Sequence, residues 1–472
     1  MRAGRAIVFL IFAVGLVFLP SLPGDFHFDD YLLLLDNPDV NSGSFRFASF
    51  LDHYGGRPLT LLSFHWNYQW AGRQPVSYLM VNLGLHLLCC LLLFGWVRSL
   101  SNRLDLALGC ALLFGIHPIQ TQAVNYIWSR SMLLMACFGL AALWAARRRP
   151  NWCSLAIFQL AIWSRTEAIA LAPFLVAQGV RPLSVIAVVG LNLIGFSVGL
   201  LLHAPSETAW QHSNMIGYWA AQPAAWLEYL RMTIVPVGLS IDHHFRPPLW
   251  QSAVSALILI GILWGGFRMS VCGRALPAKY LRYGAALWML LLMLPAALIP
   301  NEDNFNESRV YLAMAGFSFL VATAVLDQRW AILQSVPGRI GVALFLLLLA
   351  TTSALRNRQW NDNLGLWQTA AERYPDKLRI QYNLGHAFLL EDQLLPAEAA
   401  FERALRLNPE DDLSYAALGY CAEVKGDWVR AHDHYRSAFD LNPENGYAAR
   451  GLERTLRMLG EPETRPRFER RP

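Results

Sequence analysis

Long apolar segments recur through the first three quarters of this chain, and they constrain its fold more than any other feature. A helix that crosses the hydrocarbon core of a bilayer needs about 20 mostly apolar residues. The chain has 472 residues, of which 55% are hydrophobic, a share that soluble globular proteins rarely reach. We therefore predict an all-α polytopic membrane bundle over residues 1–355, with eleven candidate spans at 5–22, 76–97, 105–117, 123–146, 152–163, 168–180, 182–203, 250–267, 283–300, 309–326 and 338–355.

The basic residues between these segments predict how the bundle is oriented. With eleven spans, the loops that are rich in arginine and lysine all fall on the side of Arg2 and Arg5. The positive-inside rule makes that side cytoplasmic. The polar loops on the other side, and the C-terminal quarter, then face the periplasm or a lumen. Residues 1–24 also have the pattern of a secretory signal peptide, but the many spans that follow favour an uncleaved first span.

A repeat of 34 residues organises the C-terminal quarter, which also holds nearly half of the charged residues. The matching pairs are Leu384 and Leu418, Gly385 and Gly419, Ala397 and Ala431, Phe401 and Tyr435, and Pro409 and Pro443. This spacing is typical of tetratricopeptide repeats, which are paired helices that stack into an α-solenoid. We predict a linker with a half repeat at 356–375, repeats at 376–460 and a charged tail at 461–472. The repeats would bind an extended polypeptide partner, and the alternative is a purely structural cap.

Charge and cysteine usage argue against several classes of protein. The net charge is +5, but the basic residues lie mostly in short loops between apolar segments, so no nucleic-acid partner is predicted. There are seven cysteines without a CxxC pair, and we interpret them as small apolar residues. The triplet Asp242, His243 and His244 matches no zinc motif.

Paired carboxylates in the first outer loop are the leading candidates for catalysis. Asp29 and Asp30 follow the first span directly. A carboxylate at a membrane surface can act as a general base for a hydroxyl that attacks a sugar. Its neighbour can hold that base, bind substrate or ligate a divalent metal. The alternative is a pair of solvated loop acids.

Further polar clusters fall on the same predicted face of the bundle. An arginine is a suitable group for a lipid phosphate because its fork of donors matches the phosphate oxygens. For Arg130, which lies at the start of a span, the alternative to substrate binding is a side chain that snorkels to the membrane interface. For Arg165 and Glu167 the alternative is a purely structural pair. The predicted substrate-binding residues are Arg57, which precedes an aromatic segment, His117, Gln122, Arg130, Arg165, Glu167, Arg309 and Tyr311.

The order of these motifs resembles a known family. The chain reads FDD at 28–30, RPLTLLSFHWN at 57–67, VNLGLHLL at 81–88, HPIQTQAV at 117–124 and ESRVYLAMAG at 307–316, before the terminal repeats. This order resembles the membrane-embedded, tetratricopeptide-containing protein O-mannosyltransferases and their bacterial relatives. The resemblance implies a GT-C glycosyltransferase fold, a polyprenyl-phosphate sugar donor and Ser or Thr acceptors. It also implies that Asp29 or Asp30 is the family's first-loop acid and that Arg309 faces the donor phosphate.

Three positions depart from the family's pattern. Gln122 and Met132 stand where acids are usual, and the Lys-Glu dipeptide is replaced by Arg165-Thr166-Glu167. The two missing acids place metal binding in question.

The sequence therefore predicts an enzyme of the bacterial inner membrane, with a cytoplasmic N-terminus and periplasmic repeats. It would transfer a sugar, with inversion, from a polyprenyl-phosphate donor to an exported protein that the repeats present. No cofactor is predicted with certainty, and the donor is a lipid-linked sugar. Two alternatives are a non-enzymatic membrane scaffold that recruits partners through its repeats, and a transporter of lipid-linked sugar.

Overall fold

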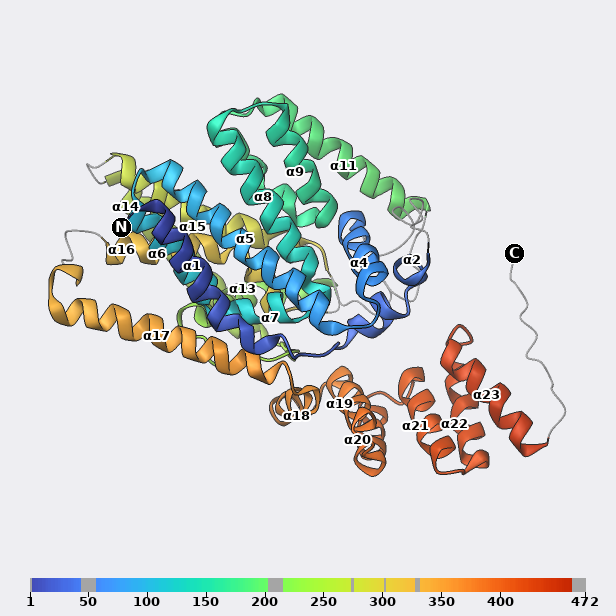
Figure 1. Cartoon of the computed structure of the whole chain (residues 1–472). Helices are drawn as coiled ribbons and strands as arrows, with labels where there is room; N and C mark the ends of the chain where they lie inside the picture. The colour runs from blue at the N-terminus through green and yellow to red at the C-terminus, as the bar shows by residue number, and fades with distance from the viewer. Residues whose placement is uncertain are drawn as a thin grey trace. The chain divides into compact units, whose positions relative to one another are not determined.

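The computed structural model describes residues 2–43, 57–202, 215–272, 276–300, 303–326 and 332–460. These residues form helices and loops without any strand (Figure 1). The chain divides into two compact units. Unit 1 contains Met1–Leu239 and Phe245–Asn361, and unit 2 contains Ser240–His244 and Asp362–Pro472. The predicted tail at 461–472 lies outside the described residues.

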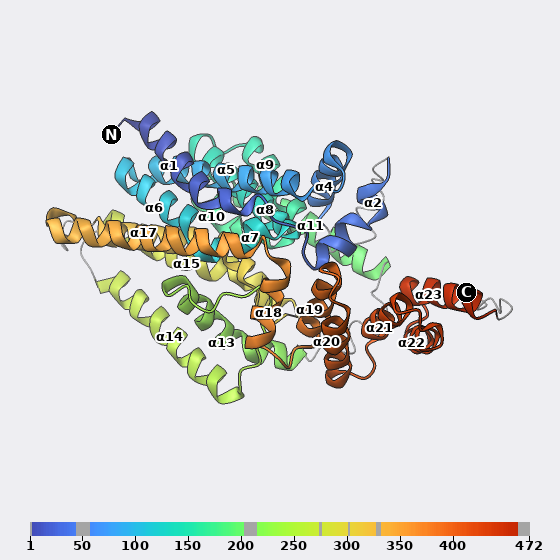
Figure 2. The same ribbon diagram turned by 60° about the horizontal axis from the view of Figure 1, so that its bottom comes forward.

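Unit 1 is a bundle of apolar helices joined by short turns of 3₁₀- and π-helix, and Figures 1 and 2 show it from two directions. Its α-helices are α1 (Ala3–Phe18), α2 (Pro38–Asn41), α4 (Pro58–Ala71), α5 (Pro75–Ser101), α6 (Leu104–Ile116), α7 (Thr121–Asn125), α8 (Arg130–Arg148), α9 (Trp152–Ser164), α10 (Ala172–Ala177), α11 (Pro182–Leu202), α13 (Met215–Ile234), α14 (Leu249–Cys272), α15 (Leu276–Leu298), α16 (Met314–Val325) and α17 (Val336–Gln359). The short turns are η1 (Leu19–Ser21), η2 (Asp30–Leu35), η3 (Pro118–Gln120), η4 (Ile127–Ser129), η5 (Thr166–Leu171), η6 (Glu307–Val310) and η7 (Ile332–Gln334).

Four helical segments of the described chain are long and apolar enough to cross a membrane. They are Ala3–Ser21, Pro75–Ser101, Ile127–Arg148 and Val336–Gln359, and the bent pair Leu104–Ile116 and Pro118–Asn125 makes a fifth if it forms one span. Six shorter apolar helices cover the remaining predicted segments. The chain therefore has the apolar helices of a membrane protein, and the count of eleven spans stays a prediction.

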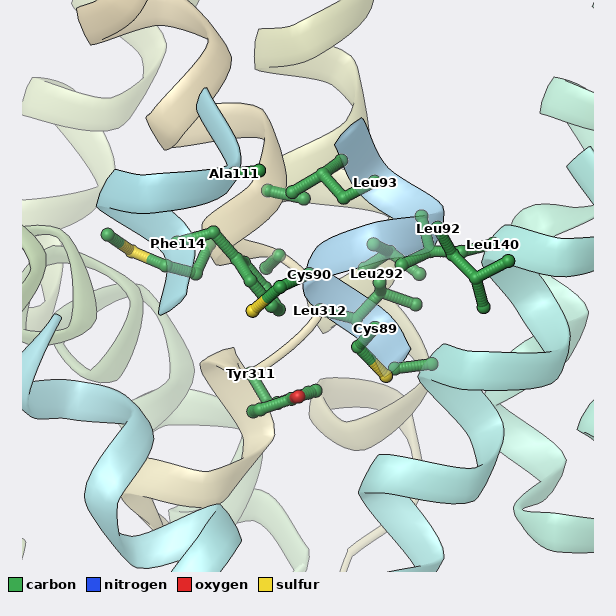
Figure 3. Packing of buried hydrophobic residues seen from close by; sticks show 14 of the residues in the cluster. Cys89, Cys90, Leu92, Leu93, Ala111, Phe114, Leu140, Leu292, Tyr311 and Leu312 are labelled. Atoms are coloured by element: carbon green, nitrogen blue, oxygen red, sulfur yellow. The ribbon is translucent and has the colours of Figure 1, made fainter. Parts of the chain in front are cut away.

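The core of unit 1 is built on close approach of its helices. Figure 3 shows Cys89, Cys90 and Phe114 packed together inside the bundle. A Cβ atom on Gly115 would lie 2.6 Å from Val14 Cγ2 and 2.9 Å from Cys90 Sγ. A glycine is therefore needed where α6 meets α1 and α5, as is common between membrane helices. The buried cysteines here behave as the small apolar residues that the sequence predicted.

Helix α17 packs against α1 and holds it in the bundle. The Asn357 side-chain amide donates to the Val17 carbonyl at 2.7 Å, and its Oδ1 accepts from Asn125 Nδ2 at 2.7 Å. Inside an apolar bundle such amide bonds are retained because no water competes for them. The first loop therefore starts from a fixed position.

Unit 2 consists of paired helices that follow the 34-residue spacing. A Cβ atom on Gly385 would lie 2.6 Å from the Phe401 ring, and one on Gly419 would lie 2.8 Å from the Tyr435 ring. Each glycine thus lets an aromatic ring of the next helix approach its backbone, which explains why both residues recur together. The helices are α18 (Asn363–Arg373), α19 (Leu378–Leu390), α20 (Leu394–Leu407), α21 (Asp412–Val424), α22 (Trp428–Leu441) and α23 (Gly446–Leu459).

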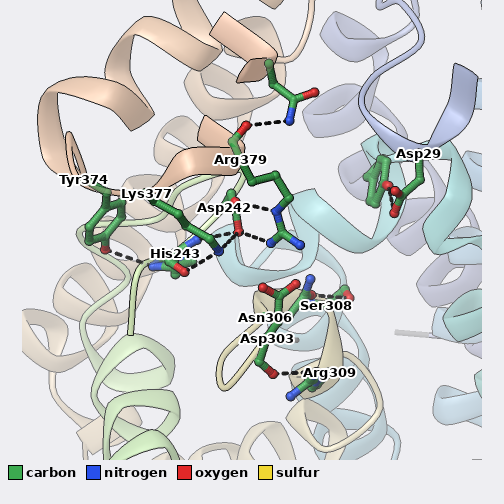
Figure 4. A network of polar contacts seen from close by, with 12 residues as sticks. Asp29, Asp242, His243, Asp303, Asn306, Ser308, Arg309, Tyr374, Lys377 and Arg379 are labelled. Atoms are coloured by element: carbon green, nitrogen blue, oxygen red, sulfur yellow. Dashed lines mark hydrogen bonds and ion pairs between the residues drawn. The ribbon is translucent and has the colours of Figure 1, made fainter. Parts of the chain in front are cut away.

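A short segment from the middle of the chain belongs to unit 2. Asp242 accepts hydrogen bonds from Lys377 Nζ at 2.7 Å and from Arg379 Nη2 at 2.6 Å (Figure 4). Burial raises the pKa of Asp242, but Arg379 and then Lys377 lower it more, so the net pKa falls below its ordinary value. His243 Nδ1 lies 3.0 Å from the Tyr374 hydroxyl. The polar side chains of this segment therefore hold the helical repeats rather than forming a separate metal site.

Candidate active site

The backbone of the first outer loop is strained next to the paired carboxylates. Phe28 has φ +50°, a left-handed conformation that is rare for a bulky residue. Asp29 follows, and the π-helical turn η2 begins at Asp30. Both a strained residue and a π-helical turn are found frequently at functional sites. The loop therefore holds its acids in a conformation that a relaxed chain would avoid.

Asp30 stabilises this loop through hydrogen bonds to backbone N–H groups. Its side chain is fully buried. Its Oδ2 accepts from the His27 backbone N–H at 2.9 Å, and its Oδ1 accepts from the Trp128 backbone N–H at 2.8 Å. Burial raises the pKa of Asp30, and these two backbone bonds oppose that rise without cancelling it. Asp30 thus joins the first loop to η4 and has both oxygens occupied.

Asp29 is in a different environment from its neighbour. It is partly exposed, and its Oδ2 accepts a hydrogen bond from the Tyr126 hydroxyl at 2.8 Å. The Tyr126 ring stacks on Trp360 with centroids 6.4 Å apart. Because Trp360 is itself buried, the tyrosine has little freedom to move. The two neighbouring carboxylates therefore have different surroundings, one enclosed by backbone N–H groups and the other partly exposed.

Arg57 lies within electrostatic reach of Asp29, of Glu167 and of two further arginines, Arg165 and Arg309. The pKa of Arg57 falls to about 10, chiefly because the group is buried and then because of the neighbouring charge of Arg165. Glu167 and Asp29 act to raise this pKa, and Arg309 adds a weaker lowering effect. Arg165 is held by Glu167, with its Nε 2.7 Å from Oε1. The structure thus brings together five of the predicted residues around one strongly basic region.

Helix α13 completes this region around Arg309. Arg309 Nη2 donates to the Asp303 carbonyl at 3.0 Å (Figure 4). Tyr229, Tyr218 and Asp303 lie within electrostatic reach of the Arg309 guanidinium. The Tyr229 hydroxyl also donates to the Asn306 carbonyl at 3.0 Å. These tyrosines lie between the predicted spans 182–203 and 250–267 and were not among the predicted site residues, although they are eleven residues apart, which is three helical turns.

Arg130 is a fully buried side chain with its own set of partners. Its Nε donates to Asn82 Oδ1 at 2.8 Å, and its Nη2 donates to Asn67 Oδ1 at 2.8 Å. Its guanidinium also lies 4.4 Å from the centroid of the Phe64 ring. These contacts tie α8 to α4 and α5, so a substrate phosphate would have to displace them.

The other predicted polar residues are buried and hold neighbouring backbone. Gln122 Oε1 accepts from the Ser308 backbone N–H at 2.9 Å, directly beside Arg309. His117 Nε2 lies 3.0 Å from the Thr233 carbonyl oxygen, and the Tyr311 hydroxyl lies 2.7 Å from His86 Nδ1. Gln122, His117 and Tyr311 are each about 1% exposed. Their contacts position η6 and α13 around the basic region.

The grouping of His, Cys, Asp and Glu side chains bears on whether a metal ion could be held. In the described part of the chain, no three His, Cys, Asp or Glu residues come close enough together to hold a metal ion. Gln122 bonds to backbone where the family pattern has an acid, and Met132 is a buried apolar contact at the second such position. We therefore derive no chemical step through a metal.

Comparison with known proteins gives relatives that agree with the motif order. No family model matches the chain. A protein O-mannosyl-transferase of Caenorhabditis elegans is 25% identical over 447 residues, covering 86% of this chain and 63% of that protein. Protein O-mannosyl-transferase TMTC3 of Homo sapiens is 28% identical over 521 residues, covering 94% of this chain and 56% of that protein. Protein O-mannosyl-transferase Tmtc3 of Drosophila melanogaster is 23% identical, and the match covers 88% of this chain and 56% of that protein. The chain thus spans less than two thirds of the length of these relatives.

Proposed function

We propose that this chain is a membrane-embedded glycosyltransferase that moves a sugar from a polyprenyl-phosphate donor to Ser or Thr hydroxyls of an exported protein. The observation that carries the proposal is the partly exposed Asp29 carboxylate, which Tyr126 holds within electrostatic reach of Arg57, an arginine that is itself close to Arg165 and Arg309. The names of the similar proteins, which are protein O-mannosyl-transferases, support the same reaction class.

Asp29 acts as the general base in this reaction. Its carboxylate takes the proton of the acceptor hydroxyl while that oxygen attacks the anomeric carbon of the sugar. The bond between this carbon and the phosphate oxygen breaks, and the lipid phosphate leaves with the electron pair. Attack from the side opposite the phosphate inverts the anomeric centre. The proton then passes from Asp29 to solvent.

The arginines stabilise the charge that develops on the leaving phosphate. Arg57, Arg165 and Arg309 supply planar donor groups that match phosphate oxygens. Glu167 holds Arg165 in place, and Tyr229 with Tyr218 surrounds Arg309. Fixed positive groups near a leaving oxygen lower the barrier because they need no rearrangement during the reaction. The leaving group's charge is therefore balanced by the chain's own residues.

The remaining assignments follow from the motif order and the repeats. We assign unit 1 to the GT-C class of membrane glycosyltransferases and the 34-residue repeats to tetratricopeptide modules. Sidedness follows the basic loops, so the site and the repeats face the periplasm of a bacterial inner membrane. The repeats hold the acceptor polypeptide, and the sugar reaches the site on its lipid carrier.

Reconstitution of the purified full chain tests this function directly. The chain is placed in liposomes with a radiolabelled polyprenyl-phosphate mannose and the exported proteins of the source cell, and label on protein is measured. Label that is removed by β-elimination, as expected for O-linked Ser or Thr, supports the proposal. Transbilayer movement of the donor without any label on protein would instead favour a transporter. Absence of both activities, with recovery of bound partner proteins, would favour the scaffold.

A further inference from the structure

The end of α8 remote from the candidate active site carries a second feature, which the proposed reaction does not use. The first turn of α8 touches that site, since Arg165 Nη1 lies 3.4 Å from Ser131 Oγ. The helix then runs to Arg148 with a rise of about 27 Å, close to the thickness of a hydrocarbon core. The two ends of α8 therefore reach opposite leaflets of the bilayer.

A pocket of about 380 Å³ lies at this second end, between α8 and the start of α9. One face of α8 lines the pocket with Ala141, Trp144, Ala145 and Arg148. The rest of the wall consists of Arg149, Asn151 and Cys153. The four α8 residues are spaced i, i+3, i+4 and i+7, so they form one continuous stripe. The stripe begins apolar and ends basic, as a lipid with an anionic head group requires.

The tryptophan in this pocket is fixed on both sides. A Cβ atom on Gly95 of α5 would lie 2.9 Å from Trp144 Cζ2, so the indole packs directly on that helix. The Arg148 guanidinium carbon lies 4.3 Å from the centroid of the same indole. The cation–π contact holds the guanidinium at the pocket wall without neutralising its charge. The basic part of the pocket is therefore formed before any ligand binds.

In the part of the chain that the structure describes, no acidic side chain forms an ion pair with the arginines at this end of α8. The chain has no Asp or Glu between Asp105 and Glu167, although Arg147, Arg148 and Arg149 are consecutive. Among the described residues, neither Arg148 nor Arg149 has a carboxylate within ion-pair distance, and both are exposed. Arg103, in contrast, is paired with Asp105 at 2.5 Å. The pocket thus offers two uncompensated guanidinium groups to an anion.

We propose that this pocket binds one anionic glycerophospholipid, with its phosphodiester on Arg148 and Arg149 and an acyl chain along Ala141 and Ala145. A lipid is favoured over a soluble phosphate because the apolar part of the pocket lies on a membrane-spanning helix. Trp152 at the start of α9 is 75% exposed, a position typical of aromatic residues at a membrane interface. Clusters of arginine at the cytoplasmic end of a membrane helix bind such head groups.

Native mass spectrometry of the detergent-solubilised full chain measures this binding. Phosphatidylglycerol should give one retained adduct, whereas phosphatidylcholine of the same acyl chains should not. The double variant Arg148→Gln with Arg149→Gln should weaken phosphatidylglycerol binding about 30-fold, because each surface arginine contributes about fivefold. The Arg103→Gln variant is the matched control and should bind as the unchanged protein does. Equal binding of both lipids, or unaltered binding by the double variant, would overturn the proposal.

Alkylation of Cys153 locates the lipid and separates loss of binding from loss of folding. Cys153 lines the pocket and is partly exposed. The rate of its modification by N-ethylmaleimide, measured by peptide mapping, should fall when phosphatidylglycerol is added and stay constant with phosphatidylcholine. The Arg148→Lys with Arg149→Lys variant should keep this protection because it keeps both charges. Protection by sn-glycerol 3-phosphate at the same concentration would show a soluble-phosphate site and contradict the lipid assignment.

Discussion

The Tyr126 hydroxyl donates to Oδ2 of Asp29 at 2.8 Å, and its ring is stacked on the buried Trp360. The bond joins the first outer loop to the segment between α7 and η4, and its two residues are 97 positions apart in sequence. It fixes the direction of the one carboxylate of the pair that is not enclosed by backbone. Asp29 is therefore aimed by a residue that contributes no charge of its own.

Replacing Tyr126 by Phe should slow the transfer step about tenfold and leave the KM for donor unchanged. The aromatic stacking remains, but Asp29 loses the bond that orients it, at a cost of about 1.4 kcal/mol in the transition state. Steady-state kinetics with a lipid-linked donor measure both quantities. A rise in the donor KM with an unchanged kcat would show that Tyr126 binds the donor instead.

Replacing Arg130 by Met should reduce stability rather than donor binding. The substitution leaves the Asn82 and Asn67 oxygens buried without their donor, and breaking a buried charged network costs about 3 kcal/mol or more. Thermal unfolding in detergent measures this loss. Arg309→Met serves as the comparison and should raise the donor KM at least tenfold with a smaller change in stability. A stable Arg130→Met protein that no longer binds donor would contradict this assignment.

Replacing Arg165 by Gln should raise the donor KM about tenfold and reduce its dependence on ionic strength. Arg165 is only 14% exposed, so it acts on the phosphate with little screening by solvent. The measurement is the donor KM at low and high salt. Arg103→Gln removes an arginine that is already paired with Asp105 on the surface and should change neither value. An identical salt response for both variants would remove Arg165 from the site.

Asp242 should make the stability of unit 2 depend on acid pH. The folded pKa lies below the ordinary value of 3.8, so the stabilisation is present above that value and is lost as pH falls through the folded pKa. Asp242→Asn should cost about 3 kcal/mol at neutral pH and abolish this dependence. Hydrogen exchange of α19 in the full chain, corrected for intrinsic rates at each pH, measures both effects. Equal acid sensitivity in the variant would contradict the assignment.

The sequence predicted the features that depend on periodicity and local spacing. Apolar segments became apolar helices, and the recurrence of Gly385 with Phe401 is explained by close packing of paired helices. A structural Arg165–Glu167 pair was the alternative interpretation of that motif, and the two side chains, which share one turn, are paired. Such features need only neighbouring residues, so a single sequence contains the information.

The sequence could not sort polar residues by their surroundings. Arg130 and Arg309 are both arginines near the start of a predicted span. Arg130 is fully buried and hydrogen-bonded to asparagine amides, whereas Arg309 lies among tyrosines. Likewise Asp242 contacts Lys377, which is 135 residues away in the chain. These outcomes depend on long-range packing, which spacing does not encode. The tetratricopeptide solenoid and the count of eleven spans stay predictions.

Comparing Asp29→Asn with Asp30→Asn in single-turnover transfer from a labelled polyprenyl-phosphate sugar tests the central claim most directly. Removal of a general base typically slows a reaction 10²- to 10⁴-fold. We expect Asp29→Asn to lose at least about 100-fold in rate while keeping donor binding and the thermal unfolding midpoint. Asp30→Asn should instead lower that midpoint, because an amide cannot accept both backbone N–H groups. Transfer by Asp29→Asn at the unchanged rate would contradict the account.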